Sequence, residues 1–187
     1  YWYRTQTFSV KWNGILSKSF TVSNGVRQGG VLSPKLFNVF IDDLSKLLVN
    51  SKIGCSIANT CVNHLNYADD TVILAPTAFA LQELLDICIA YAKEVGILYN
   101  RKKTRCMYFK PKTYENLWIP SVFLDGFMLQ FVNWYKYLGC IIETGLCDNL
   151  DIERQTQAVY IRGNMLVRNF SECSQEVKVE LFRSYCS

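Results

Sequence analysis

The sequence predicts an α+β fold in which an antiparallel sheet carries helices on one of its faces. Three observations predict it. Short segments of apolar or alternating residues flank tight-turn pairs, Asn13-Gly14 and Asp125-Gly126, which is typical of antiparallel hairpins. Two longer segments, 33–48 and 81–96, repeat their apolar residues at helical spacing. Beyond Gly145 the spacing is helical, so we expect a helical appendage after the sheet.

Composition and charge indicate one main folded domain with an appendage. The chain has 187 residues, of which 50% are hydrophobic and 19% charged, with a formal net charge of +4. These values are typical of a globular protein and exclude a disordered chain. No apolar run reaches the ~18 residues of a membrane span, so we expect an intracellular protein without a membrane partner. The eight cysteines form no CxxC pair, which favours reduced thiols over disulfides or a zinc site.

The first expected elements are a hairpin and a helix. Apolar and polar residues alternate from Phe8 to Val22 around Asn13-Gly14, which predicts the hairpin. Ser33 is the expected N-cap of a helix of about four turns, with Pro34 in its first turn. The apolar positions of this helix are Phe37, Phe40, Ile41, Leu44, Leu47 and Leu48.

The later elements are a second helix and several short strands. Gly96 is expected to close the second helix, because glycine readily adopts the left-handed backbone that ends helices. The expected strands run from Thr71 to Ala75, where Pro76 ends the strand, from Arg105 to Lys110, from Val122 to Leu124, from Phe127 to Phe131 and from Tyr137 to Ile142.

The segment Tyr67-Ala68-Asp69-Asp70 is the most informative for function. Adjacent carboxylates repel each other and are costly to bury without a counter-charge. A divalent cation supplies that charge, and Mg²⁺ prefers a few carboxylate oxygens together with water and substrate phosphates. On its own, the pair fits a solvated turn as well as a metal site. Another pair, Asp42-Asp43, lies within the expected first helix, where neighbours point about 100° apart, so we assign it to the surface.

Two further segments carry residues suited to nucleotides and phosphates. Residues 25–34 place glycines beside Arg27 and Gln28 just ahead of a helix, which lets the backbone approach a nucleotide or a template strand. An ordinary loop is the alternative. A local excess of basic residues suits phosphate contacts, with a solvated loop as its alternative. These basic residues are Arg101, Lys102, Lys103, Arg105, Lys110 and Lys112.

Four segments, taken in this order, resemble the polymerase motifs of reverse transcriptases. GVRQGGVLSPKLFNVFIDDL (25–44) resembles the B motif and NYADDTVIL (66–74) the C motif with its Tyr-x-Asp-Asp core. GILYNRKKTRCMYF (96–109) resembles the D motif, and YKYLGCII (135–142) the E motif, or primer grip. The residues of these motifs resemble those of the non-LTR (LINE-type) retrotransposon branch, particularly in the segments RQGGVLSP, YADD, KTRCMYF and YLG. The resemblance implies a polymerase palm over residues 1–144 and the start of a helical thumb over residues 145–187.

The resemblance also implies an activity and residue roles. The activity is RNA-directed DNA polymerisation by two-metal nucleotidyl transfer to a primer 3′ hydroxyl. Asp69 is the implied ligand of catalytic Mg²⁺, or of Mn²⁺ in its place, with Asp70 assisting, and Lys103 protonates or neutralises the departing pyrophosphate. The residues implied at the substrate, the template and the primer are Arg27, Gln28, Gly29 and Tyr67, together with the grip residues Tyr137, Leu138 and Gly139.

One catalytic group of the family has no counterpart in this sequence. Family members carry a further aspartate in an A motif upstream of the B motif, but Tyr1 to Asn24 contain no aspartate. We therefore expect a fragment of a longer polyprotein that has little activity alone. The alternatives are a non-catalytic nucleic-acid-binding remnant and a palm that serves as a protein-interaction scaffold. A maturase-like or telomerase-like palm fits the residues of these motifs less well.

The resemblance finally implies partners and a location. The partners are an RNA template, a DNA primer or target, and deoxynucleoside triphosphates, and the parent polyprotein carries an endonuclease domain. The expected location is the nucleus, the cytoplasm or both, as a ribonucleoprotein.

Overall fold

The computed structural model describes residues 6–22, 25, 29–110 and 118–186. The chain forms two compact units, the first of residues 1–99 and 120–128, the second of residues 100–119 and 129–187. Within the described residues there are four helices and fourteen short strands, so the predicted α+β class is confirmed. The strands pair as two-stranded ladders, six antiparallel and one parallel. No helix in the described ranges is long and apolar enough to cross a membrane.

The first unit begins with the predicted hairpin. Asn13 and Gly14 have φ angles of 46° and 81°, the left-handed values of a two-residue hairpin turn. The turn joins β2 (Lys11–Trp12) to β3 (Ile15–Leu16), and β1 (Thr7–Phe8) pairs with β4 (Phe20–Thr21) further from the turn.

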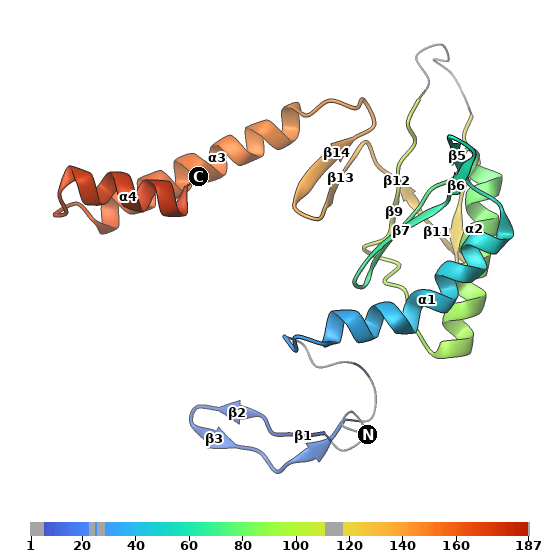
Figure 1. Cartoon of the computed structure of the whole chain (residues 1–187), viewed down its shortest axis with the longest axis horizontal. Coiled ribbons are helices and arrows are strands. Elements are labelled where there is room, and N and C mark those ends of the chain that lie inside the picture. Colours follow the sequence, from blue (N-terminus) through green and yellow to red (C-terminus); the bar gives the residue numbers. More distant parts are fainter. Residues whose placement is uncertain (1–5, 23–24, 26–28, 111–117, 187) are drawn as a thin grey trace. The chain divides into compact units, whose positions relative to one another are not determined.

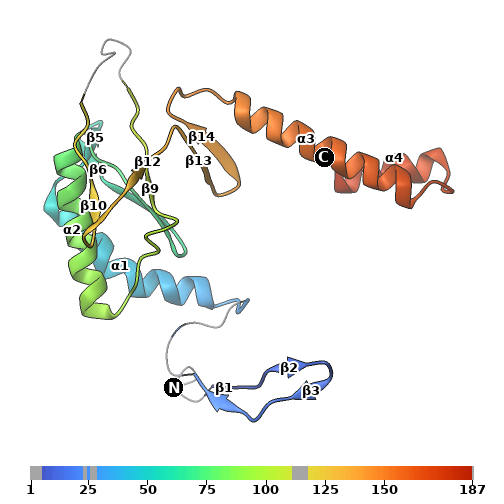
Figure 2. The ribbon, with the colours of Figure 1, turned by 180° about the vertical axis from the view of Figure 1, so that it is seen from behind.

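Helices α1 (Ser33–Ser51) and α2 (Ala78–Val95) contact each other and build the core of the first unit (Figure 1). Tyr91 of α2 ties the helices together, because its hydroxyl donates to the Phe40 carbonyl of α1 at 2.8 Å. The buried side chains of the core are Ile41, Leu44, Leu48, Leu84, Cys88 and Tyr91. Figure 2 shows the same pair of helices from behind.

The two helices begin and end differently from one another. Helix α1 has 19 residues, about five turns and so one more than predicted. The prediction of Ser33 as N-cap is wrong, because the Leu32 carbonyl already accepts the Leu36 amide at 3.0 Å and Leu32 takes the N-cap place with a helical backbone. Helix α2 ends as predicted at Gly96, with φ 75°. Its N-cap is Thr77, whose hydroxyl accepts the Ala80 amide.

Four strands between these helices form two hairpins. They are β5 (Cys55–Ile57) with β6 (Thr60–Val62), and β7 (His64–Tyr67) with β8 (Asp70–Ile73). Only β8 was predicted, and it begins one residue earlier and ends two residues sooner than expected. The first unit closes with β10 (Phe123–Leu124) and β11 (Phe127–Met128) around the predicted turn at Asp125-Gly126.

The second unit joins short strands to two helices. β9 (Arg105–Cys106) pairs in parallel with β12 (Gln130–Phe131), and β13 (Trp134–Tyr137) pairs with β14 (Cys140–Glu143). Helix α3 (Asn149–Asn169) contacts both β14 and α4 (Gln175–Tyr185), which confirms the predicted helical end of the chain.

Three strand predictions in this part of the chain need correction. The strand expected from Arg105 to Lys110 stops at Cys106. The strand expected from Phe127 to Phe131 is interrupted at Leu129. The single strand expected from Tyr137 to Ile142 is a hairpin, because the pair at 138–139 adopts φ angles of 46° and 89° and reverses the chain.

Candidate functional site

The β7–β8 hairpin carries the paired carboxylates. Tyr67 pairs with Asp70, so Ala68 and Asp69 form the two-residue turn between the strands. Ala68 has a φ of 51°, a strained value for a residue with a Cβ atom, which fixes the path of the chain at the tip. Asp69 therefore lies at the tip of the hairpin and Asp70 begins β8, and both side chains are exposed.

Helix α1 determines which face of this hairpin is exposed. In an antiparallel ladder directly paired residues share a face, so Tyr67 and Asp70 lie on one face and Asn66 lies on the other. The Asn66 amide donates to Ser45 Oγ of α1 at 2.9 Å, and Ile73, on the same face as Asn66, packs against the helical core. The face that packs on α1 leaves Tyr67 and Asp70 on the opposite, exposed side.

A buried asparagine anchors the base of the hairpin. Asn63 is 2% exposed, and its side-chain nitrogen donates to the Leu48 carbonyl at 2.6 Å and the Ile53 carbonyl at 2.7 Å. The backbone carbonyl of Asn63 accepts the Leu74 amide at 2.8 Å. A Cβ atom added to Gly54 would lie 2.5 Å from the Asn63 Cβ, so the packing requires glycine there. Sequence reasoning missed Asn63, because asparagine is mostly exposed in proteins and a single sequence gives no signal of its burial.

The second pair of adjacent aspartates, Asp42-Asp43 in α1, lies on the surface. Lys46 Nζ lies 2.8 Å from Asp42 Oδ2 and 3.0 Å from Asp43 Oδ1, and all three side chains are more than half exposed. The hydrogen bonds that the Lys46 ammonium donates to the two carboxylates raise the pKa of Lys46 above its ordinary value. The surface assignment of Asp42-Asp43 is therefore confirmed.

The glycine-rich segment ahead of α1 is described only in part. Arg27 and Gln28 lie outside the described residues. Gly29 is exposed with a φ of 78°, a conformation that glycine adopts without strain. The Gly30 carbonyl accepts the Ser33 amide at 3.1 Å, which joins the segment to the first turn of α1.

In the second unit a tight loop presents the basic residues. The Lys103 amide donates to Asn100, and the Thr104 hydroxyl donates to the Asn100 carbonyl at 2.9 Å. Arg105 Nη1 closes the loop by donating to the Lys102 carbonyl at 2.5 Å. These bonds use backbone groups and the side chains of Asn100, Thr104 and Arg105, so the ammonium groups of Lys102 and Lys103 project from an ordered, exposed loop.

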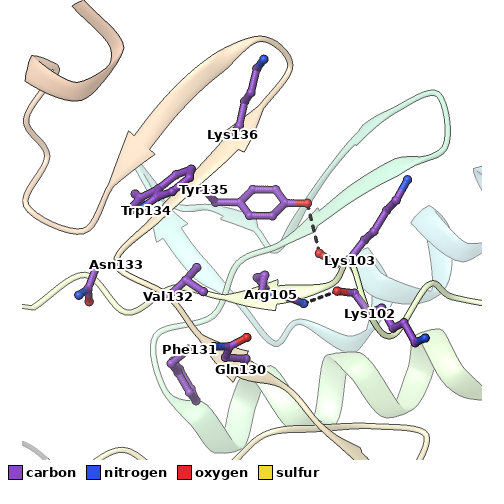
Figure 3. Close-up of a pocket in the computed structure, with 10 residues that line it drawn as sticks. All are labelled: Lys102, Lys103, Arg105, Gln130, Phe131, Val132, Asn133, Trp134, Tyr135 and Lys136. Atoms are coloured by element: carbon purple, nitrogen blue, oxygen red, sulfur yellow. Dashed lines mark hydrogen bonds between the residues drawn. The ribbon is translucent and has the colours of Figure 1, made fainter. Parts of the chain in front are cut away.

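This loop forms one wall of an open cavity of about 680 Å³ (Figure 3). The Tyr135 hydroxyl donates to the Lys103 carbonyl at 3.3 Å and links the loop to β13. The lining has four cationic and three aromatic side chains and no carboxylate. Its residues are Lys102, Lys103, Arg105, Gln130, Phe131, Val132, Asn133, Trp134, Tyr135 and Lys136. Cations contact phosphates and aromatic rings stack on bases, so the lining suits a single nucleic-acid strand.

The β13–β14 hairpin carries the predicted grip residues. Leu138 and Gly139 form its exposed turn, and Tyr137 is half-buried at the end of β13. Two residues of α3 contact this turn and were not singled out from the sequence. Arg154 Nη2 donates to the Gly139 carbonyl, and Asp151 Oδ1 accepts the Ile141 amide.

The structure thus groups the predicted residues within each unit. Tyr67, Asp69 and Asp70 share one hairpin in the first unit, whereas Lys103 and the grip residues belong to the second. Among the described residues, no group of three or more His, Cys, Asp or Glu side chains could hold a metal ion. The two exposed carboxylates of Asp69 and Asp70 nevertheless offer hard oxygen donors, the kind that divalent cations such as Mg²⁺ bind.

Comparison with known proteins identifies the family. Residues 2–142 match the family described as reverse transcriptase (RNA-dependent DNA polymerase), whose members are generally dependent on divalent metal ions. The RNA-directed DNA polymerase from mobile element jockey of Drosophila melanogaster is 28% identical over 188 residues, which cover 96% of this chain and 20% of that protein.

Two relatives come from R2 elements. The Pol polyprotein from type-2 retrotransposable element R2DM of Drosophila melanogaster is 39% identical over 95 residues, or 51% of this chain and 9% of that protein. The polyprotein from type-1 retrotransposable element R2 of Popillia japonica is 30% identical over 134 residues, or 67% of this chain and 22% of that protein. The chain spans about a fifth or less of the length of these relatives. With its four motifs in order and its paired aspartates on an exposed hairpin, the chain belongs to the reverse transcriptase family, in the non-LTR retrotransposon group of jockey and R2.

Proposed function

We propose that the chain supplies part of the active site of an RNA-directed DNA polymerase that extends a primer 3′ hydroxyl on an RNA template. The observation that carries the proposal is the β7–β8 turn, which exposes Asp69 and Asp70 at the end of a hairpin anchored on α1. A solvated surface turn needs no such anchoring. The match of residues 2–142 to the reverse transcriptase family supports a polymerase role for this turn.

Asp69 and Asp70 are the residues that would hold Mg²⁺, or Mn²⁺ in its place. A bound divalent ion would activate the attacking hydroxyl and stabilise the leaving pyrophosphate. Tyr67 shares the exposed face of Asp70 and is placed by the proposal at the primer end. Gly29 has the open backbone that a template or an incoming nucleotide can approach, and Arg27 and Gln28 belong to the same proposed contact.

The basic loop and the cavity serve the nucleic acid in this proposal. Lys103 is exposed on an ordered loop, so its ammonium can donate a proton to the departing pyrophosphate or neutralise it. Lys102, Arg105 and Lys136 contribute phosphate contacts without reading sequence, and Trp134 offers a ring for base stacking. The turn at Tyr137, Leu138 and Gly139 holds the primer strand.

A second carboxylate-bearing segment is part of the same proposal. Two-metal chemistry uses carboxylates from separate segments, and Tyr1 to Asn24 contain no aspartate. We therefore expect the 187 residues alone to extend primers poorly. The proposed partners are an RNA template, a DNA primer or target and deoxynucleoside triphosphates, with an endonuclease domain elsewhere in a longer polyprotein. The proposed location is the nucleus, the cytoplasm or both.

Primer extension with Mg²⁺ on an RNA template tests the proposal. The 187 residues are compared alone and within a longer polypeptide that carries an A-motif segment ahead of them. We expect extension only by the longer polypeptide and a loss of about a thousandfold or more in Asp69→Asn, because a metal ligand is removed. Asp42→Asn is the matched control, since it removes one carboxylate from the surface pair and should keep full activity. Equal activity of the two variants would contradict the metal role of Asp69.

A nucleic-acid-binding remnant without turnover is the second candidate. The cavity favours it, because its cationic and aromatic lining can bind a strand without metal ions. If the folded longer polypeptide binds RNA but never extends a primer, this second candidate replaces the first.

A further inference from the structure

In the described part of the chain, β13 and β14 form a two-stranded sheet, and helix α3 contacts β14 beside its turn. A two-stranded hairpin is marginally stable in isolation, so the direction of its turn depends on what it packs against. Leu138 and Gly139 at the turn are exposed, and α3 contacts β14. Side chains from the first two turns of α3 form hydrogen bonds with the backbone at and beside this turn.

Asp151 covers an open backbone donor of β14. Tyr137 and Cys140 flank the two-residue turn, and paired residues alternate between bonded and non-bonded positions along an antiparallel ladder. Ile141 is the next residue on β14, so its amide points away from β13 at the edge of the hairpin. Asp151 Oδ1 accepts this amide at 2.9 Å, which satisfies a donor that would otherwise face solvent.

Arg154 binds the backbone on the other side of Cys140, at Gly139, whereas Asp151 binds it at Ile141. Its Nη2 lies 2.5 Å from the Gly139 carbonyl and 2.7 Å from Asp151 Oδ1, and its Nε lies 3.1 Å from the same oxygen. The Asp151 and Arg154 side chains are only 21% and 29% exposed. One carboxylate and one guanidinium thus connect α3 to two backbone groups beside the turn.

We propose that Asp151 and Arg154 are positioning residues that fix the turn at Leu138-Gly139 on helix α3, so that turn and helix act on the primer strand as one body. The inference rests on the proposed function, in which this turn holds the primer. Asp151 and Arg154 touch neither primer nor metal in this scheme and act through the backbone of the turn.

Two pairs of variants on the same helix test the inference in the longer, active polypeptide. Asp151→Asn and Arg154→Lys weaken the contact, whereas Glu153→Gln and Arg162→Lys make the same chemical changes at exposed positions of α3 that do not contact the turn. Lysine keeps the charge of Arg154 but lacks the planar fork that reaches both partners.

We expect Asp151→Asn and Arg154→Lys to raise KM for the primer–template about tenfold and to leave kcat within about twofold. Partial unfolding would do the opposite, because fewer active molecules lower kcat and leave KM unchanged. A KM equal to that of Glu153→Gln and Arg162→Lys would overturn the inference.

Hydrogen exchange in the 187-residue chain provides a readout that needs no activity. The Ile141 amide should exchange about tenfold faster in Asp151→Asn than in Glu153→Gln, because its acceptor is weakened. Unchanged exchange contradicts the contact itself. Failure of the unmutated polypeptide to extend primers contradicts the proposed function instead. In that case the affinity of the same variants for a primer–template duplex decides whether the contact positions the strand.

Discussion

At the scale of single residues, the candidate site depends on side chains that do no chemistry. Asn63 joins the end of α1 to the base of the β7–β8 hairpin through two carbonyls, and Gly54 leaves room for it. The aspartates at the tip are exposed, and they were singled out as adjacent carboxylates in a segment that resembles the C motif, whereas Asn63 and Gly54 were not singled out. Adjacent carboxylates can be read directly from a sequence, but a buried anchor depends on packing that a single sequence does not reveal.

Gly54→Ala should destabilise the first unit. The new Cβ would lie 2.5 Å from the Asn63 Cβ, and the φ of 149° at this position is unfavourable for alanine. We expect a loss of about 1–3 kcal/mol in the free energy of unfolding. Urea denaturation measures it.

Gly163→Ala in α3 is the control for Gly54→Ala. Its Cβ would meet only Phe182 at an ordinary 3.6 Å, and alanine favours a helix by roughly 0.5–1 kcal/mol over glycine. If Gly54→Ala is as stable as the unmutated chain, Asn63 does not pack as tightly as the structure indicates.

At the scale of elements, tight turns decided which strands were predicted correctly. Asn13-Gly14 and Asp125-Gly126 have the residues that favour positive φ, and both hairpins were predicted. Ala58-Asn59 and Leu138-Gly139 adopt the same backbone with an apolar first residue, and neither hairpin was expected. At these two places the turn lies between paired strands although its first residue gives no turn signal.

The contact between α3 and the β13–β14 hairpin should weaken in acid. The Arg154 guanidinium and the Ile141 amide lower the pKa of Asp151 below its ordinary value, and the charge of Lys136 adds to this effect. A lowered pKa in the folded state means that the contribution to stability is present above pH ~4 and is lost as the pH falls through the folded-state pKa. Arg154 and Lys136 stay charged throughout this range.

Helix content followed by circular dichroism during thermal unfolding, between pH 3 and pH 6, measures this loss. We expect the difference in stability between the unmutated chain and Asp151→Asn to shrink as the pH falls below ~4. A difference that does not change with pH would show that the charge of Asp151 contributes nothing to the contact.

At the scale of the whole molecule, the reactivity of the cysteine thiols tests whether each of the two units is folded. Cys88 in the first unit and Cys106 in the second are buried, and burial raises the pKa of each thiol to about 11. Cys140 and Cys147 are exposed. Because the thiolate is the reactive form, we expect a thiol reagent at pH 8 to label Cys140 and Cys147 first.

Mass spectrometry of the labelled chain measures this order. Cys88 and Cys106 should react only when urea unfolds the unit that contains each of them. Early labelling of Cys88 would contradict the core formed by α1 and α2, and early labelling of Cys106 would contradict the fold of the second unit.

The order of the motifs predicted the family, and the tight-turn pairs with the helical spacing predicted the α+β class. Neither predicted that the chain divides into two units. Helical spacing in α1 and α2 and the position of Gly96 were enough to predict two helices. The division after Tyr99 and the return at Pro120 depend on contacts between distant segments, which local patterns do not encode. The proposed boundary between palm and thumb after residue 144 stays a prediction.

Residues 120–128 belong to the first unit but are made after residues 100–119, and this order has a consequence for synthesis on the ribosome. Gln82 of α2 accepts the Phe123 amide at 2.7 Å and donates to the Phe123 carbonyl at 2.9 Å, and Lys93 pairs with Asp125. Phe123 is translated 41 residues after Gln82, and Asp125 follows Lys93 by about thirty residues. The nascent first unit therefore lacks these partners of α2 while residues 100–119 are made. Codons in the stretch for residues 100–128 therefore set how long an incomplete first unit is exposed to chaperones and proteases.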